Sequence, residues 1–193
     1  MGKIYYIMGK SSSGKDTIYK KLMDRMRGKL KTVTGYTTRP KREGETDGIE
    51  YFFVTDEKYR EMCNQGIVIE SRNYNTIYGV WTYFTADDGQ IELEKSDYLL
   101  IGTLESCKEL KAYYGKDKIV PLYIEADDGD RLLRAIKRER KQEVPGYEEM
   151  CRRFLADQKD FCEEKLIECG IIKRYKNMDL EKCIEEISSD IYG

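Results

Sequence analysis

The sequence contains no histidine and only three prolines and one tryptophan among its 193 residues. Without histidine, triads built on imidazole are excluded, so any catalysis must rest on lysine, arginine, carboxylates or bound metal. The six cysteines are scattered without a CxxC pair, which together with the missing histidine argues against zinc. We interpret them as reduced thiols in core or helix positions of a cytosolic protein.

Long apolar runs and a strong excess of one charge are also lacking. No stretch approaches the roughly 18 apolar residues that cross a bilayer, and the amino terminus has no signal-peptide pattern, so we expect a cytoplasmic protein with no membrane partner. Thirty-four basic residues against 36 acidic ones leave a formal charge of -2. That balance argues against a nucleic-acid partner and requires any anion site to be local.

Apolar runs alternate with helical patterns, which indicates one α/β domain with a parallel sheet. A strand at residues 3–8 ends at Gly9, and a helix begins near Gly14. Further strands are expected at residues 31–34, 50–54, 67–70, 98–102, 119–124 and 170–174.

Helix boundaries are marked by capping residues and by one proline. Thr55 is a suitable N-cap for a helix that ends at Gly66, and Asp179 for another. Within the charged helical stretch 130–166, Val144-Pro145-Gly146 predicts a break into two helices with an exposed tip. We expect these two helices to form a hinged lid.

The segment after the first strand has the Walker A spacing, and it lies between a strand and a helix as that motif requires. Its backbone N–H groups, the helix N-terminus and the Lys15 ammonium would bind the phosphates of ATP. The alternative is a loop that merely joins strand to helix. The predicted ATP-binding residues here are Gly9, Ser11, Ser12, Ser13, Gly14, Lys15, Asp16 and Thr17.

Asp16 stands where a serine or threonine usually ligates magnesium in this motif, and Thr17 follows it. A carboxylate in this place predicts an atypical shell, with Asp16 binding Mg²⁺ directly or through water. Mg²⁺ with ATP is therefore the expected cofactor.

Two arginines three residues apart precede a strand that begins with a tyrosine. Guanidinium groups bind phosphate in a bidentate manner, and a tyrosine hydroxyl adds a donor, so Arg39, Arg42 and Tyr51 predict a second anion site. A solvated basic loop is the alternative.

The run from Thr37 to Tyr51 matches T-T-R-x-x-R-x-G-E-x-x-G-x-x-Y and resembles the acceptor loop of the guanylate kinase family. The resemblance implies that Arg39, Arg42, Tyr51 and Tyr78 hold the GMP phosphate. Glu70 would accept hydrogen bonds from guanine N1–H and the 2-amino group. Towards the C-terminus, residues resembling catalytic lid arginines and an asparagine near adenine are Arg138, Arg140, Arg153 and Asn177.

The same resemblance implies a three-layer P-loop NTPase fold with a small acceptor-binding insertion and a helical lid. The core would comprise about residues 1–34, 85–130 and 168–193, the acceptor-binding segment about 35–84, and the lid about 131–165.

The sequence departs from the family pattern on the acceptor side. Gly35 replaces a serine that contacts guanine, and Val80-Trp81 replaces small hydroxyl residues. The strand before Thr103 lacks two acids, although Thr103 keeps a hydrogen-bonding group for GMP.

We therefore expect transfer of the ATP γ-phosphate to GMP by a monomer or homodimer. Two alternatives remain open: a related kinase with another phosphorylated acceptor, such as a ribose bisphosphate, or a guanylate-kinase-like binding module without catalysis. Lys15-Asp16 resembles the ribose bisphosphate kinases, whereas an intact Lys15 argues against the binding module.

Overall fold

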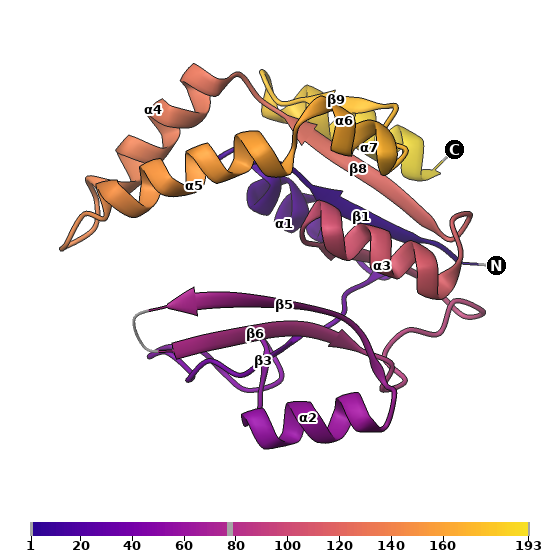
Figure 1. The fold of residues 1–193 in the computed structure, drawn as a ribbon. Coiled ribbons are helices and arrows are strands. Elements are labelled where there is room, and N and C mark those ends of the chain that lie inside the picture. The colour runs from indigo at the N-terminus through magenta and orange to yellow at the C-terminus, as the bar shows by residue number, and fades with distance from the viewer. Residues whose placement is uncertain (1, 77–78, 193) are drawn as a thin grey trace.

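A five-stranded parallel sheet forms the centre of the protein in a computed structural model, which describes residues 2–76 and 79–192 (Figure 1). Its strands run in the order β2-β7-β1-β8-β9, and every neighbouring pair is parallel. They are β1 (Ile4–Met8), β2 (Leu30–Lys31), β7 (Asp97–Ile101), β8 (Ile119–Glu125) and β9 (Arg174–Lys176).

Helices cover both faces of this sheet because its central strand is apolar on both sides. Alternate residues of β1 enter two separate core clusters, Tyr6 in one and Ile7 in the other. The Ile7 cluster includes residues of α1 (Lys15–Arg25) and α7 (Leu180–Tyr192). The Tyr6 cluster includes residues of α3 (Leu104–Tyr114) and α6 (Glu163–Glu168).

A second sheet of four strands lies apart from the first, with strand order β4-β3-β6-β5 (Figure 1). The helix α2 (Asp56–Asn64) covers its far face, where the Tyr59 and Phe84 rings lie 4.9 Å apart. The opposite face is turned toward the central sheet. The strands are β3 (Tyr36–Thr37), β4 (Phe52–Phe53), β5 (Val68–Thr76) and β6 (Gly79–Ala86).

Two helices form a hairpin that extends away from the central sheet in Figure 1, α4 (Asp128–Glu139) and α5 (Tyr147–Asp160). The break between them contains Val144-Pro145-Gly146, as expected from the sequence. No helix in the described part of the chain is long and apolar enough to cross a bilayer.

The expected α/β class, the parallel sheet and both N-caps are confirmed. The backbone N–H of Lys58 donates to Thr55 Oγ1, and that of Lys182 donates to Asp179 Oδ1. The prediction of a strand at 170–174 was wrong. Gly170, in the left-handed region at φ 68°, ends α6, and the strand begins only at Arg174.

Three further strand predictions had the wrong length: those at 31–34 and 50–54 were too long, and that at 67–70 was too short. Only Leu30–Lys31 and Phe52–Phe53 pair where longer strands were expected, whereas residues 67–70 lead into the nine-residue strand β5. The strands β3 and β6 were not predicted. They join the second sheet, which falls between Tyr36 and Ala86, but the exact division into core, acceptor-binding segment and lid stays a prediction.

Candidate active site

The loop between β1 and α1 is shaped by two glycines that are in close contact with other backbone and side-chain atoms. Gly14 has φ 95°, and a Cβ there would lie 2.2 Å from Asn177 Nδ2. A Cβ at Gly9 would lie 2.5 Å from the Ile124 carbonyl oxygen. The loop therefore bends tightly before Lys15, which opens α1 with its side chain toward the space beyond the sheet edge.

Side chains from distant parts of the chain hold this loop in place. Arg131 Nε donates to the Ser11 carbonyl at 2.9 Å, and the Ser11 N–H donates to Asp157 Oδ2 at 2.7 Å. Arg131 also donates to the same Asp157 oxygen at 2.7 Å. Asn177 Nδ2 donates to the Ser13 carbonyl at 2.7 Å. Asn177 is thus engaged with the loop backbone, and its contact with adenine stays a prediction.

The Lys15 side chain is largely buried, and its ammonium makes only a long ion pair. Its burial lowers the pKa of the ammonium, and the charges of Asp16 and Asp157 partly oppose that effect. Its Nζ lies 3.9 Å from Asp16 Oδ2. Because the Asp16 side chain is exposed at the start of α1, its carboxylate is available as a hard oxygen ligand, which suits Mg²⁺. Thr17 is likewise exposed.

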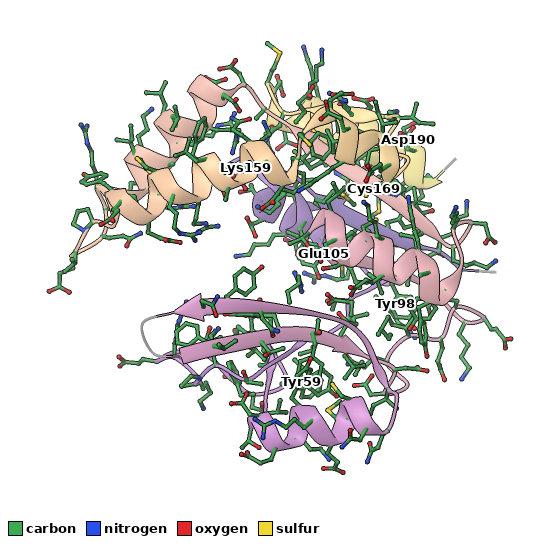
Figure 2. All side chains as sticks on the ribbon, in the orientation of Figure 1. Tyr59, Tyr98, Glu105, Lys159, Cys169 and Asp190 are labelled. Carbon is green, nitrogen blue, oxygen red and sulfur yellow. The ribbon has the colours of Figure 1, made fainter. Side chains whose placement is uncertain are left out.

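A cleft separates the two sheets and brings residues from both to one space. Lys15, Thr103 and Arg153 line it from the central domain. Tyr51 and Glu70 line it from the second sheet. Glu105, labelled in Figure 2, lies in the first turn of α3 and lines an adjoining pocket that shares Lys15, Thr103 and Arg153 with the cleft. Of the residues predicted for the second anion site, Tyr51 lines this cleft together with Lys15, whereas Arg39 and Arg42 are not among its lining residues.

Thr103 has a second role as the N-cap of α3. Its Oγ1 accepts a hydrogen bond from the Ser106 N–H at 3.3 Å and lies 2.9 Å from Ser106 Oγ. Tyr78, predicted to bind the acceptor phosphate, lies outside the described residues.

Arg39 is buried and already paired within the second sheet. It donates from both terminal nitrogens to the Glu45 carboxylate at 2.7 and 2.6 Å, and from Nε to Tyr83 Oη at 3.0 Å. The Arg39 guanidinium and the Arg42 backbone N–H lower the pKa of Glu45 to about 2. The Arg42 side chain is exposed. A phosphate that reaches Arg39 must share it with Glu45 or displace that carboxylate.

Glu70 lies beneath the cleft surface beside a second arginine. Its Oε1 accepts a hydrogen bond from Thr85 Oγ1 at 2.7 Å, and its Oε2 lies 3.1 Å from Arg72 Nε. At Gly35 a Cβ would lie 3.5 Å from the nearest atom, the Phe84 carbonyl oxygen, an ordinary contact. The missing serine is therefore not a consequence of crowding.

The predicted lid arginines differ in their distance from the loop. Arg153 donates to Ser11 Oγ at a long 3.4 Å, and Arg138 borders a small cavity with Ser11 while pairing with Glu139. Arg140 is exposed at the C-cap of α4. The roles of all three stay predictions.

Several residues at the site were not predicted from the sequence. Arg131 and Arg134 reach the loop backbone from α4, and the one signal for them was a stripe of arginines that includes Arg138, at helical spacings of three and four. Arg72 alternates with Glu70 on a strand that we expected to end at residue 70. Others that the sequence analysis missed are Arg152 and Asp157.

Strand, glycine-bounded loop and helix, in this order on a parallel sheet, are consistent with the P-loop class of nucleotide-binding α/β proteins. The sequence model described as guanylate kinase matches residues 1–151. The chain belongs to the guanylate kinase family. That match ends before Arg153 and Asn177.

Individual relatives agree with this assignment. The guanylate kinase of Wolbachia pipientis wMel is 28% identical over 193 residues, covering 97% of this chain and 88% of the relative. That of Thermotoga maritima is 36% identical over 138 residues, or 69% and 64% of the two chains. With the Legionella pneumophila (strain Lens) enzyme, 38% identity extends over 79 residues, so the alignment spans only 37% of that relative.

The fold is shared with a solved structure. The crystal structure of guanylate kinase from Anaplasma phagocytophilum superposes with a TM-score of 0.65 at 18% identity, covering 99% of this chain and 85% of the other.

Proposed function

We propose that this chain transfers the γ-phosphate of ATP to GMP, producing ADP and GDP. One observation carries the proposal: Lys15, which follows the phosphate loop, and Glu70, which matches the family's guanine-reading residue, line the same cleft from opposite sheets. Membership of the guanylate kinase family supports it. Because both substrates are cellular nucleotides, we also propose action in the cytoplasm as a monomer or homodimer, with no nucleic-acid or membrane partner.

The loop and Lys15 would bind ATP. Backbone N–H groups at the start of α1 and the partial positive charge of the helix N-terminus favour the phosphates. The Lys15 ammonium makes only a long ion pair, at 3.9 Å, with the exposed Asp16 carboxylate among the described residues, so its charge is available to the outer phosphates. Asp16 would hold Mg²⁺, which when bound neutralises phosphate charge.

The second sheet would bind GMP. Glu70 is an acceptor for two adjacent donors of guanine, a pattern that adenine does not offer. Tyr51 would donate to the acceptor phosphate, together with Arg39 once it is released from Glu45, and with Arg42 and Tyr78.

Transfer between two bound nucleotides depends mainly on position and charge. The GMP phosphate is already a nucleophile near neutral pH, so no imidazole base is required. Lys15 and Arg153 would stabilise charge on the transferring group, and closure of the cleft would exclude water so that hydrolysis does not compete.

The test is a steady-state assay with ATP, Mg²⁺ and each of GMP, AMP, CMP, UMP and ribose 1,5-bisphosphate. We expect turnover with GMP alone. Turnover of another acceptor with GMP inert would refute the proposal. Gly35 offers no side chain to contact a base, which favours ribose bisphosphate as the second candidate.

Lys15→Met is the matched inactive variant, since methionine keeps most of the chain length without the charge. We expect it to fold, by circular dichroism, and to lose about 10²- to 10³-fold in kcat, as for removal of one transition-state donor. Full activity of Lys15→Met would show that transfer does not use this loop as proposed.

A further inference from the structure

The cleft contains an arginine that the proposed mechanism leaves without a role. Glu70, Arg72 and Tyr74 occupy alternate positions on β5 and line the same cleft. Ser71, between them, points to the other face, where the Tyr59 hydroxyl of α2 donates to it at 3.1 Å. The alternation therefore turns Arg72 toward the cleft in which we propose that the acceptor binds.

Arg72 and Glu70 are close together but incompletely hydrogen-bonded. Their side chains are 21% and 1% exposed, and Arg72 Nε lies 3.1 Å from Glu70 Oε2. The second contact, from an Arg72 terminal nitrogen to Glu70 Oε1, is long at 3.4 Å. Among described residues, neither Arg72 Nε nor Glu70 Oε2 has a hydrogen-bond partner of acceptable angle. A buried donor and a buried acceptor thus lie side by side with bonding capacity unused.

This pair complements the edge of guanine. That edge presents two donors, N1–H and the 2-amino group, beside one acceptor, O6. The Glu70 carboxylate can accept hydrogen bonds from the two donors, but O6 needs a hydrogen-bond donor from the protein. Gly35 has no side chain, and the Thr85 hydroxyl already donates to Glu70.

We propose that Arg72 donates a hydrogen bond to O6 of guanine while Glu70 accepts from N1–H and the 2-amino group, which makes Arg72 a specificity-determining residue of this chain. The inference rests on the proposed GMP acceptor. Adenine carries an amino group at position 6, so it would set a donor against the Arg72 guanidinium.

The experiment compares GMP with 6-thio-GMP, which keeps both donors but replaces O6 with sulfur, a weak acceptor. In the wild-type enzyme we expect kcat/KM for GMP to exceed that for 6-thio-GMP by about tenfold or more. Arg72→Met should lower kcat/KM for GMP by about 10- to 100-fold. The ratio of kcat/KM for GMP to that for 6-thio-GMP should then be close to one. Arg72→Lys, which keeps a charged donor, should restore part of the preference.

Two controls separate this role from others. IMP lacks only the 2-amino group, so the ratio of GMP to IMP reports on Glu70 and should be unchanged in Arg72→Met. Arg60→Met changes an exposed arginine of α2 on the far side of the sheet and should leave both ratios unchanged. Thermal unfolding verifies that each variant is folded, and Arg72→Gln replaces the methionine variant if that one does not fold.

Three results would overturn the role of Arg72. Equal kcat/KM for GMP and 6-thio-GMP in the wild-type enzyme would refute the contact between Arg72 and O6 before any variant is measured. If Arg72→Met kept the wild-type ratio of kcat/KM for GMP to that for 6-thio-GMP, the contact would also be refuted. Equal loss for both acceptors, with weaker inhibition by inorganic phosphate, would instead assign Arg72 to the acceptor phosphate. A wild-type enzyme that is inert toward GMP would refute the proposed function itself.

Discussion

Arg39 and Arg131 are the buried arginines of the described chain, and each is matched by a carboxylate. Arg39 is held by Glu45, and Arg131 by Asp157. Removing one partner of such a pair leaves an uncompensated charge, so these contacts strongly determine where each guanidinium lies. The geometry of the proposed phosphate sites therefore depends on acids that we do not expect to bind phosphate.

Acid sensitivity should follow from the pair formed by Arg39 and Glu45. Because the folded-state pKa of Glu45 is lowered to about 2 from 4.5, its stabilisation is present above about pH 4.5 and is lost as pH falls toward 2. We expect Glu45→Gln to be less stable than wild type at pH 7, with the difference shrinking in acid. Urea unfolding between pH 7 and pH 3 measures this, and a difference that stays constant with pH would contradict it.

Glu70→Gln should affect selectivity more than ATP binding. Glutamine keeps the shape of the side chain but sets an amide donor against the donors of guanine, so kcat/KM for GMP should fall by about 10²-fold or more. The KM for ATP should remain close to that of wild type. Acceptor assays at saturating ATP check the first expectation, and equal loss of ATP and GMP binding would undermine the assigned role.

The helical hairpin α4–α5 stabilises the phosphate loop through contacts with its backbone. Arg131 of α4 and Asp157 of α5 contact each other and both contact Ser11. Since the Arg131 side chain is only 1% exposed, its charge depends on protein partners, here Asp157 and Asp128. The hairpin and the phosphate loop are therefore one hydrogen-bonded unit.

Asp157→Asn should destabilise the fold by about 1–3 kcal/mol, because a charge-assisted contact to a buried guanidinium is weakened. Asp128 remains as a partner, which limits the loss. Asp160→Asn, one turn along the same helix and 65% exposed, is the matched control and should cost less than about 1 kcal/mol. Urea unfolding measures both, and equal effects would show that the Asp157 contact contributes little.

The arrangement of the whole molecule places two binding surfaces on separate sheets. The central sheet presents the phosphate loop, and the second sheet presents Glu70 and Arg72 across the cleft. Among the described residues, those proposed for one nucleotide thus have no hydrogen bond or ion pair to those proposed for the other. The proposed transfer requires both sheets to hold their nucleotides at once, which favours closure when both are bound.

Binding of the two nucleotides should therefore be cooperative. A non-hydrolysable ATP analogue with Mg²⁺, or GMP alone, should each raise the melting temperature. Together they should raise it by more than the sum of the two shifts, because the first ligand supplies part of the ordering that the second requires. Differential scanning calorimetry at fixed ligand concentrations tests this, and strictly additive shifts would argue against coupled closure.

Features that depend on neighbouring residues were readable in the sequence. The phosphate loop, the caps at Thr55 and Asp179 and the break at Pro145 each arise from interactions within a few positions, so their residues lie together in the chain. The alternation of apolar runs with helical patterns likewise indicated a parallel sheet. The α/β class followed from these signals, and the residues proposed for the two halves of the site were predicted from them.

Contacts between distant residues depended on the folded chain. Ser11 meets Arg131 and Asp157 across more than a hundred positions, and no periodicity in the sequence links them. The pairing of β5 with β6 placed Arg72 beside Glu70 in the cleft, because a strand assigns alternate side chains to opposite faces only once its length and register are set. Local chemistry therefore specified which groups could bind phosphate, while packing of remote segments determined which of them face one another and which are already neutralised.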